Sequence, residues 1–381
     1  MPHYTHKPYH PRPQQNGLLL HRASVWLALL AVSLVAAGLA GCSNMGYYWQ
    51  SVSGHVAVMS AAKPVKDWLD DAATPDNTKR RLELSQRIRD FASTELLLPD
   101  NASYRRYADL KRRAAVWNVV AAPEFSLTLH TWCFAVVGCV GYRGYYSEAD
   151  AKGEAEVKKA EGLEADVYGV PAYSTLGYLN WAGGDPLLST FINYPEGELA
   201  RLIFHELSHQ VLYAKDDTMF NESFATAVER LGGAQWLTQF GSEAARTEYA
   251  QFDQRRTQFR ALTMATRKNL EAVYAVVSKN TAGAAMKIEA MKVFKEDYEK
   301  LKLQWAGYAG YDPWVAKANN ASFGALAAYD ELVPQFDALF AQQTGSGKER
   351  WRKFYAACQT LADMPRKQRR EALASATIAS R

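Results

Sequence analysis

The chain carries the sequence LIFHELSHQVL at residues 202–212. Apolar residues on both sides of His205-Glu206-Leu207-Ser208-His209 predict a buried helix, which runs from about residue 196 to 213 behind Pro195. His205 and His209 are four positions apart, so their imidazoles project from one face of that helix, one turn apart. Titratable groups on a buried helix are costly unless they are paired or bind a metal. The stretch therefore predicts a metal site inside a helical core.

The same spacing points to hydrolysis at a zinc ion. Both imidazoles can reach one tetrahedral Zn²⁺ at about 2.0–2.1 Å. Glu206, on the rim of that face, can reach a water at the metal without being a ligand, and can take its proton as general base. The alternative is a pair of ordinary histidines on a buried helix.

A third ligand is predicted in FNESFA at residues 220–225. A short loop separates this segment from the first helix, so a second helix over about 220–232 can pack antiparallel and aim Glu222 at the histidines. Hydrolytic zinc sites use three protein ligands and leave one position to water, whereas structural sites close with four. His205, His209 and Glu222 are therefore the predicted metal ligands, and Glu206 is the predicted catalytic residue.

The N-terminus has the features of an export signal. An apolar run over residues 23–40 follows a basic flank and closes with LAGC at 39–42, where small residues mark a cleavage site. This ending resembles the bacterial lipoprotein box, which implies removal of residues 1–41 and lipidation of Cys42, and Ser43 resembles the outer-membrane sorting pattern. The alternative is an uncleaved anchor helix, since about 18 apolar residues could just span a bilayer. We expect a lipid anchor in the outer membrane and a protein that faces the periplasm.

The remaining cysteines agree with export. Cys133 and Cys139 lie close together in sequence, and in an oxidising compartment such a pair predicts a local disulfide. The alternative is two buried free thiols. A metal role is disfavoured because no second Cys or His pair of suitable spacing accompanies them. Cys358 has no evident partner and is expected to be a buried core thiol.

The rest of the chain predicts an α+β fold that is predominantly α-helical. We expect helices over 66–97, through Tyr104, Leu110 and Val116, over 148–164, and over about 243–279 and 282–306, with strands over 117–146 and 167–179. The expected organisation is a signal peptide at 1–41, a tether at 42–62, a core with a small β-sheet and the predicted metal site at 63–235 and a C-terminal helical region at 236–381.

The charge balance argues against a nucleic-acid partner. The formal net charge is only +4 over 381 residues, and nucleic-acid binders normally show a concentrated basic face. Arg105-Arg106 and Lys111-Arg112-Arg113 are expected on the solvated face of the second helix.

Several motifs together resemble a known family. His-Glu-x-x-His followed by Asn-Glu-x-Phe-Ala is similar to the gluzincin metallopeptidases, particularly to the corresponding helix of zinc aminopeptidases. With the lipoprotein box, the further motifs resemble the predicted aminopeptidase lipoproteins of Gram-negative bacteria, most densely from 130 to 235. These motifs are WC-x5-CVGYRGY at 132–145, AYSTLG at 172–177 and DPLLST at 185–190.

The resemblance implies a gluzincin-like zinc peptidase core. It assigns the ligand role to His205, His209 and Glu222 and the base role to Glu206. It also matches Glu229, two turns beyond Glu222, to a glutamate that supports a zinc-bound histidine; the alternative is a surface carboxylate. The 12 residues at 210–221 are a shorter insert than the large aminopeptidases have.

A donor to the oxyanion is also required. Tyr329 and Tyr213 are the main candidates, with Tyr173 and Tyr308 behind them, although most tyrosines simply pack with a paired hydroxyl. The stretch 172–176 is expected to be either a core strand or an edge strand that pairs with substrate backbone.

The expected function is zinc-dependent hydrolysis of peptide bonds, with aminopeptidase as its narrower form. An aminopeptidase needs an anionic pocket for the free amino group, and no residue is identified for it. The alternatives are an endopeptidase of envelope proteins, a hydrolase of another amide such as a peptidoglycan stem link, and a non-catalytic lipoprotein that binds peptide or protein. The expected partners are a peptide or protein substrate and the membrane, with no nucleic acid.

Overall fold

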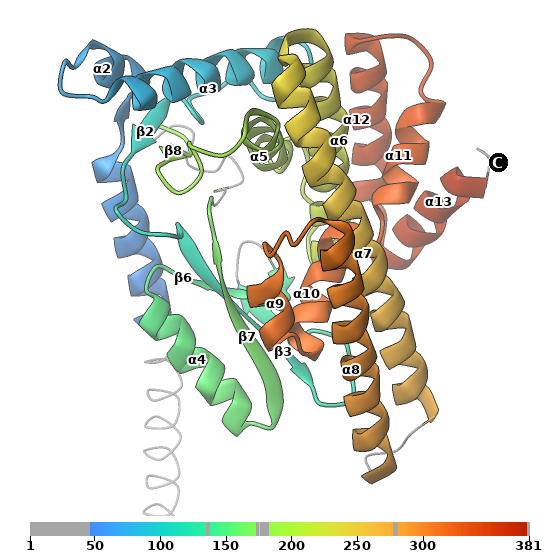
Figure 1. Cartoon of the computed structure of the whole chain (residues 1–381). Helices are drawn as coiled ribbons and strands as arrows, with labels where there is room; N and C mark the ends of the chain where they lie inside the picture. The colour runs from blue at the N-terminus through green and yellow to red at the C-terminus, as the bar shows by residue number, and fades with distance from the viewer. Residues whose placement is uncertain (1–45, 135–137, 173–174, 176–182, 277–280, 379–381) are drawn as a thin grey trace, which may run out of the picture. The chain divides into compact units, whose positions relative to one another are not determined.

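The structure is a computed structural model that describes residues 46–134, 138–172, 175, 183–276 and 281–378. The chain divides into two compact units, Met1–Ser53 and Gly54–Arg381. The second unit holds the sheets and the labelled helices (Figure 1). The prediction of a mainly helical fold with small sheets is confirmed.

The predicted signal peptide and Cys42 lie outside the described residues. Part of the predicted tether is helical, at residues 46–53 in the first unit and 54–61 in the second. Within the described residues, none of the helices combines the length and the apolar character needed to cross a membrane.

A small three-stranded sheet opens the second unit. β1 (Lys63–Pro64) pairs antiparallel with β2 (Arg106–Ala108), and β2 pairs in parallel with β8 (Leu187–Leu188). Two helices, α2 (Val65–Asp70) and α3 (Asp76–Thr94), follow β1 along the chain. The parallel pair places β8, which precedes residues 202–212 in the chain, beside β2, which follows α3.

Two of the helix predictions in this part are wrong. The helix predicted over 66–97 is two helices, because Pro75 disfavours helical backbone at the residue before it. The helix predicted through Tyr104, Leu110 and Val116 does not form. Tyr104 and Lys111 have φ of 65° and 52°, in the left-handed region, and β2 takes up strand pairing between them. The basic residues at 105–106 and 111–113 therefore share no helix.

The largest sheet has the order β6-β3-β7 and is antiparallel. Its strands are β3 (Val116–Pro123), β6 (Arg143–Tyr145) and β7 (Leu163–Val170), and α4 (Glu148–Ala160) connects β6 to β7. β7 begins directly after Gly162, which has φ of 83°, so the strand starts four residues earlier than predicted. Asn118 pairs with Tyr168 and Val120 with Asp166, which puts these four side chains on one face.

A disulfide joins two short paired strands. β4 (Trp132–Phe134) and β5 (Gly138–Val140) pair antiparallel with Cys133 opposite Cys139, and the two cysteines are bonded. Gly138 has φ of 78°, a conformation that favours glycine. Cys358 is a buried free thiol, as expected.

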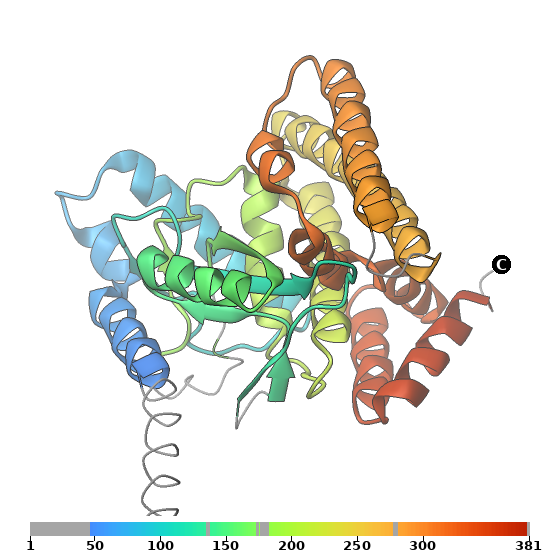
Figure 2. The same cartoon turned by 90° about the horizontal axis from the view of Figure 1, so that it is seen from below.

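The remaining chain is helical among the described residues. Its helices are α5 (Glu196–Ser208), α6 (Thr218–Phe240), α7 (Glu243–Val276), α8 (Thr281–Gln304), α9 (Asp312–Lys317), α10 (Asn320–Asp330), α11 (Val333–Gln342), α12 (Lys348–Ala362) and α13 (Arg366–Ile378). α6 runs through residues 235 and 236, where the core and the C-terminal region were expected to meet. Figure 1 and Figure 2 both show α7 and α8 side by side.

The helices pack around a main core and a second, aromatic one. The main core surrounds α5 and α6 and includes Phe204, Phe220, Phe224, Phe336 and Trp351. The second core lies between α7, α8, α9 and α10. α10 also packs on the large sheet, where Ala321 meets Val120 and Ala122. α10 therefore stands between the sheet and α6, and this position brings its C-terminal end to the candidate site.

Candidate metal centre

α5 presents both histidines from a buried helix. Four of its apolar side chains are fully buried: Leu199, Ile203, Phe204 and Leu207. Pro195 occupies the position before the first turn, where a missing N–H leaves no helical hydrogen bond unmade. The helix ends at Ser208 with His209 as its C-cap, earlier than the predicted end at 213. His209 is nevertheless one turn beyond His205 on the same face.

The predicted ligands converge. Nε2 of His205 lies 3.3 Å from Oε2 of Glu222, and Nε2 of His209 lies 3.6 Å from the same oxygen. The two Nε2 atoms are 3.3 Å apart. His205, His209 and Glu222 are all buried and form a group that could hold a metal ion.

These separations fit one small cation. Ligand atoms about 2.0–2.1 Å from a tetrahedral centre lie roughly 3.3–3.4 Å from one another. Two imidazole nitrogens and one carboxylate oxygen form the donor set of hydrolytic zinc sites, which leaves one tetrahedral position for water or substrate. The donor atoms therefore match a metal ion in both chemistry and spacing.

The electrostatics of the group favour positive charge where the ligand atoms meet. Burial alone would raise the pKa of Glu222, but the two histidines bring it down to about 2. Burial alone would lower the pKa of His205, yet the nearby carboxylates of Glu222 and Glu229 raise it well above its usual value. The carboxylates thus stabilise a cation at this point, whether a proton or a metal ion.

Glu206 has a different environment from the ligands. It is partly exposed and is not one of the converging residues. Burial raises its pKa, and the charges of His205 and His209 only partly offset that effect. A carboxylate with a raised pKa beside a ligand group is suited to accept a proton and return it.

Glu229 connects the candidate metal ligands to a buried arginine. Its Oε2 lies 3.0 Å from Nδ1 of His205. Its Oε1 accepts from Nε of Arg201 at 3.2 Å and also from Nη2. Burial alone would raise the pKa of Glu229, but Arg201 lowers it below its usual value. An ionised Glu229 at this place orients the His205 ring so that Nε2 faces the other ligands.

Arg201, which was not among the predicted site residues, contacts a further carboxylate besides Glu229. It is 4% exposed, and its Nη1 lies 3.5 Å from Oδ1 of Asp253 on α7. Its position four residues before His205 was a usable signal, because i and i+4 side chains share a helix face.

Tyr329, on α10, covers His205. The two rings are stacked with centroids 6.1 Å apart and planes inclined by 27°. Tyr329 also interacts with Tyr168 of β7, which pairs with Asn118 of β3. Burial raises the pKa of Tyr168 to about 12 and that of Tyr329 well above its usual value. These phenols therefore keep their protons at neutral pH and remain hydrogen-bond donors.

The other tyrosine candidates lie in different places. Tyr213 lies in the loop after α5, near Tyr142, whose pKa it helps to raise. Tyr308 belongs to the second core, against Trp305 and Tyr311. Tyr173 lies outside the described residues, as does most of the stretch 172–176.

The loop between the histidines and Glu222 is fixed by two residues for which no role was predicted from the sequence. Asn221 accepts a hydrogen bond from the backbone N–H of Ala214 and donates one to its carbonyl, both at 2.8 Å. Asp217 caps α6 by accepting from the N–H of Phe220 at 3.2 Å. An Asp just before an apolar helical run is an N-cap signal, so Asp217 could have been found.

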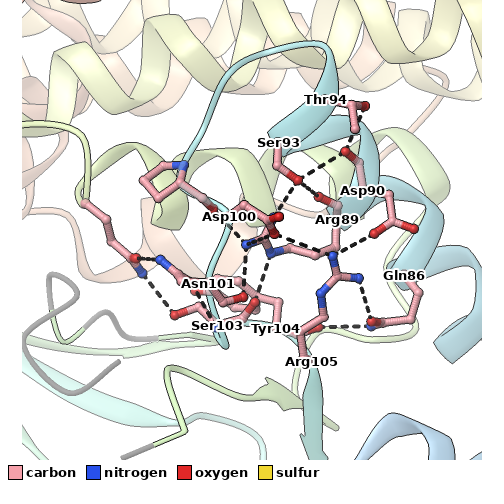
Figure 3. Close-up of polar contacts among 12 residues, drawn as sticks. Gln86, Arg89, Asp90, Ser93, Thr94, Asp100, Asn101, Ser103, Tyr104 and Arg105 are labelled. Carbon is pink, nitrogen blue, oxygen red and sulfur yellow. Dashed lines mark hydrogen bonds and ion pairs between the residues drawn. The ribbon is translucent and has the colours of Figure 1, made fainter. Parts of the chain in front are cut away.

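A second support reaches the site from α3 (Figure 3). Arg89 is fully buried and donates to the backbone carbonyls of Pro99, Asn101 and Ser103. Burial lowers its pKa to about 10, so the guanidinium stays charged at neutral pH. The amide of Asn101 donates to Oε1 of Gln210 at 2.8 Å. Gln210 comes directly after His209, so the loop held by Arg89 supports the end of α5.

Comparison with known proteins gives one match. Residues 46–373 match the profile of a protein family described as "Putative aminopeptidase". No curated protein and no solved structure matches the chain. The matched range contains every residue described above for the metal centre.

Proposed function

The chain belongs to the family described as putative aminopeptidases, and on that premise we propose that it is a zinc-dependent peptidase. The observation that carries the proposal is the convergence of Nε2 of His205, Nε2 of His209 and Oε2 of Glu222, with Glu206 beside them. A purely structural metal site has no use for Glu206, whereas hydrolysis needs a base at that place.

The residues divide the chemistry among them. A zinc ion held by the three ligands would supply a Lewis acid that activates water and polarises the scissile carbonyl. Glu206 takes the proton of the attacking water and passes it to the leaving amine, a role that suits its raised pKa. Tyr329 donates a hydrogen bond to the oxygen that becomes negative at the attacked carbonyl. Its protonated phenol over His205 supports that assignment, and Tyr213 is the second candidate.

The narrower proposal is an aminopeptidase on an outer-membrane lipoprotein that faces the periplasm. The family description supports the first part. The apolar run at 23–40 and LAGC at 39–42 support export and lipidation of Cys42. The Cys133–Cys139 bond agrees with an oxidising compartment.

Replacement of Glu206 by Gln tests the enzymatic proposal. Gln keeps the size of the side chain but cannot take a proton, so zinc content should remain while peptide cleavage falls by about 10²–10⁴-fold. Glu83→Gln, the same change at an exposed position of α3, is the matched control and should cleave normally. Equal cleavage by the Glu206→Gln variant and the wild type would exclude Glu206 as the base.

A digest of a peptide library, read by mass spectrometry, tests the aminopeptidase proposal. Removal of single residues from free N-termini is expected, and N-terminal acetylation of the same peptides should block it. Internal cuts that acetylation leaves unchanged would identify an endopeptidase instead. Zinc binding without any cleavage would favour the non-catalytic alternative.

A further inference from the structure

The C-terminal helix α13 contacts the start of the helix that carries Glu222. Asp217, the N-cap of α6, is 1% exposed. Its Oδ2 accepts a hydrogen bond from Nη1 of Arg369 at 2.7 Å, and its Oδ1 accepts one from Arg370. Both arginines are on α13, more than 150 residues away in sequence. A buried carboxylate is thus held between two guanidinium groups at the first turn of α6.

Arg369 contacts several other groups besides Asp217. It is 4% exposed and donates to the backbone carbonyls of Leu361, Ala362 and Met364, where α12 ends. Its guanidinium also lies over the ring of Phe220, 5.1 Å from the centroid. One side chain therefore joins α12, α13 and the first turn of α6.

The contact between Arg369 and Asp217 lies close to the third predicted metal ligand. Asp217 ends the loop that leads from His209 to α6, and Glu222 lies in the second turn of that helix. A helix end that loses its capping interactions opens locally at a smaller free energy than the whole protein. Opening of this turn would move Glu222 away from the histidines.

We propose that Arg369 is a positioning residue of the metal centre, which acts through Asp217 to hold Glu222 against His205 and His209. The inference rests on the proposed metal site. Without the contact, the first turn of α6 is formed for only a fraction of the time. The apparent dissociation constant for the metal is then the intrinsic constant divided by that fraction. The alternative is that Arg369 only stabilises the docking of α13.

Zinc affinity of the full chain separates these two roles. Arg369→Met removes the charge at similar length, and we expect the dissociation constant for zinc to rise about ten-fold, the lower end of the effect of residues that support metal ligands. Asp217→Asn keeps a good N-cap residue but removes the ion pair, and the same direction is expected. Lys367→Met, at an exposed position of α13, is the matched control and should bind zinc as the wild type does. Competition with a chelating indicator measures all four proteins.

The outcomes are distinct. If Arg369→Met is folded, unchanged zinc affinity of this variant overturns the positioning role. If Arg369→Met does not fold, unchanged zinc affinity of a folded Asp217→Asn variant overturns it. A lower melting temperature with unchanged zinc affinity has the same consequence, because it shows a structural role alone. If the wild type itself binds no metal, the proposed function fails as well. If the wild type binds zinc and cleaves peptides while the variants match it, only the positioning role fails.

Discussion

The metal-centre region, formed by α5 and α6, and the aromatic region, formed by the second core of α7, α8, α9 and α10, are both buried but differ in chemistry. The metal-centre region buries Arg201, His205, His209 and Glu222. The aromatic region buries mainly rings: Phe259, Phe294, Tyr298, Trp305 and Phe323. Buried rings stabilise a fold directly, whereas buried charges are costly unless each has a partner.

This difference predicts which substitutions affect function and which affect stability. In the metal-centre region the charged groups contact one another: Arg201 donates a hydrogen bond to Glu229, and Glu229 contacts His205. In the aromatic region the rings stack and pack, as Phe259 does on Tyr311 with centroids 4.0 Å apart. Substitutions in the first region should change metal binding and catalysis, and those in the second should change the free energy of unfolding.

Loss of a ligand should have the largest effect. His209→Ala removes one of three metal ligands, and peptide cleavage should fall by at least about 10⁴-fold because the activated water is lost. Steady-state cleavage and metal content measure it. His130→Ala is the control, since His130 is not in the ligand group. Full cleavage by the His209→Ala variant would contradict the ligand assignment.

Loss of a buried ring should affect only stability. Phe294 is 1% exposed, and Phe294→Ala should lower the free energy of unfolding by about 3–5 kcal/mol. Urea titration measures this change, and zinc affinity of the folded variant should equal that of the wild type. A parallel loss of zinc affinity would show that the two regions are coupled.

Loss of the charge beside His205 should have a smaller effect on the metal. Glu229→Gln keeps a hydrogen-bond acceptor near Nδ1 but removes the charge, so zinc affinity should fall about 10–100-fold. Glu271→Gln on α7, where the side chain is 51% exposed, provides the matched change in the aromatic region and should leave zinc affinity unaltered. If both variants bind zinc equally, Glu229 does not support His205.

The smallest effect concerns alkaline pH in the aromatic region. Burial raises the pKa of Tyr274 from 10.0 to about 12. A group whose pKa is higher in the folded state stabilises the fold fully below its unfolded value, and this contribution is lost as pH rises through the folded value. Stability should therefore decrease between about pH 10 and pH 12, and less steeply in Tyr274→Phe. Denaturant titrations across that range test it, with the exposed Tyr48→Phe as control; equal slopes in all three proteins would contradict the assignment.

The candidate metal centre was largely predictable because its signals are local. His205 and His209 share a helix face through their spacing alone, and Glu222 follows after a short loop. Arg201 could have been predicted in the same way, because it lies four residues before His205. The contact of Arg369 with Asp217 was not, because 152 residues separate the two and no periodicity links them.

The fold was predictable where the helices are long and amphipathic, as at α7 and α8. It was not predictable between residues 104 and 116. There β2 depends on β1 and β8 for its pairing. The left-handed backbone occurs at Tyr104 and Lys111, which are not glycines, so the sequence gives no sign of it. Pairing with distant strands therefore prevailed over local helical periodicity.

The most direct test of the metal centre is anomalous diffraction from zinc-loaded crystals, recorded on both sides of the zinc absorption edge. The account predicts one peak bound by Nε2 of His205, Nε2 of His209 and a carboxylate oxygen of Glu222, each at about 2.0–2.2 Å. A peak at another group of residues, or no peak at these three in crystals shown to contain zinc, would contradict it.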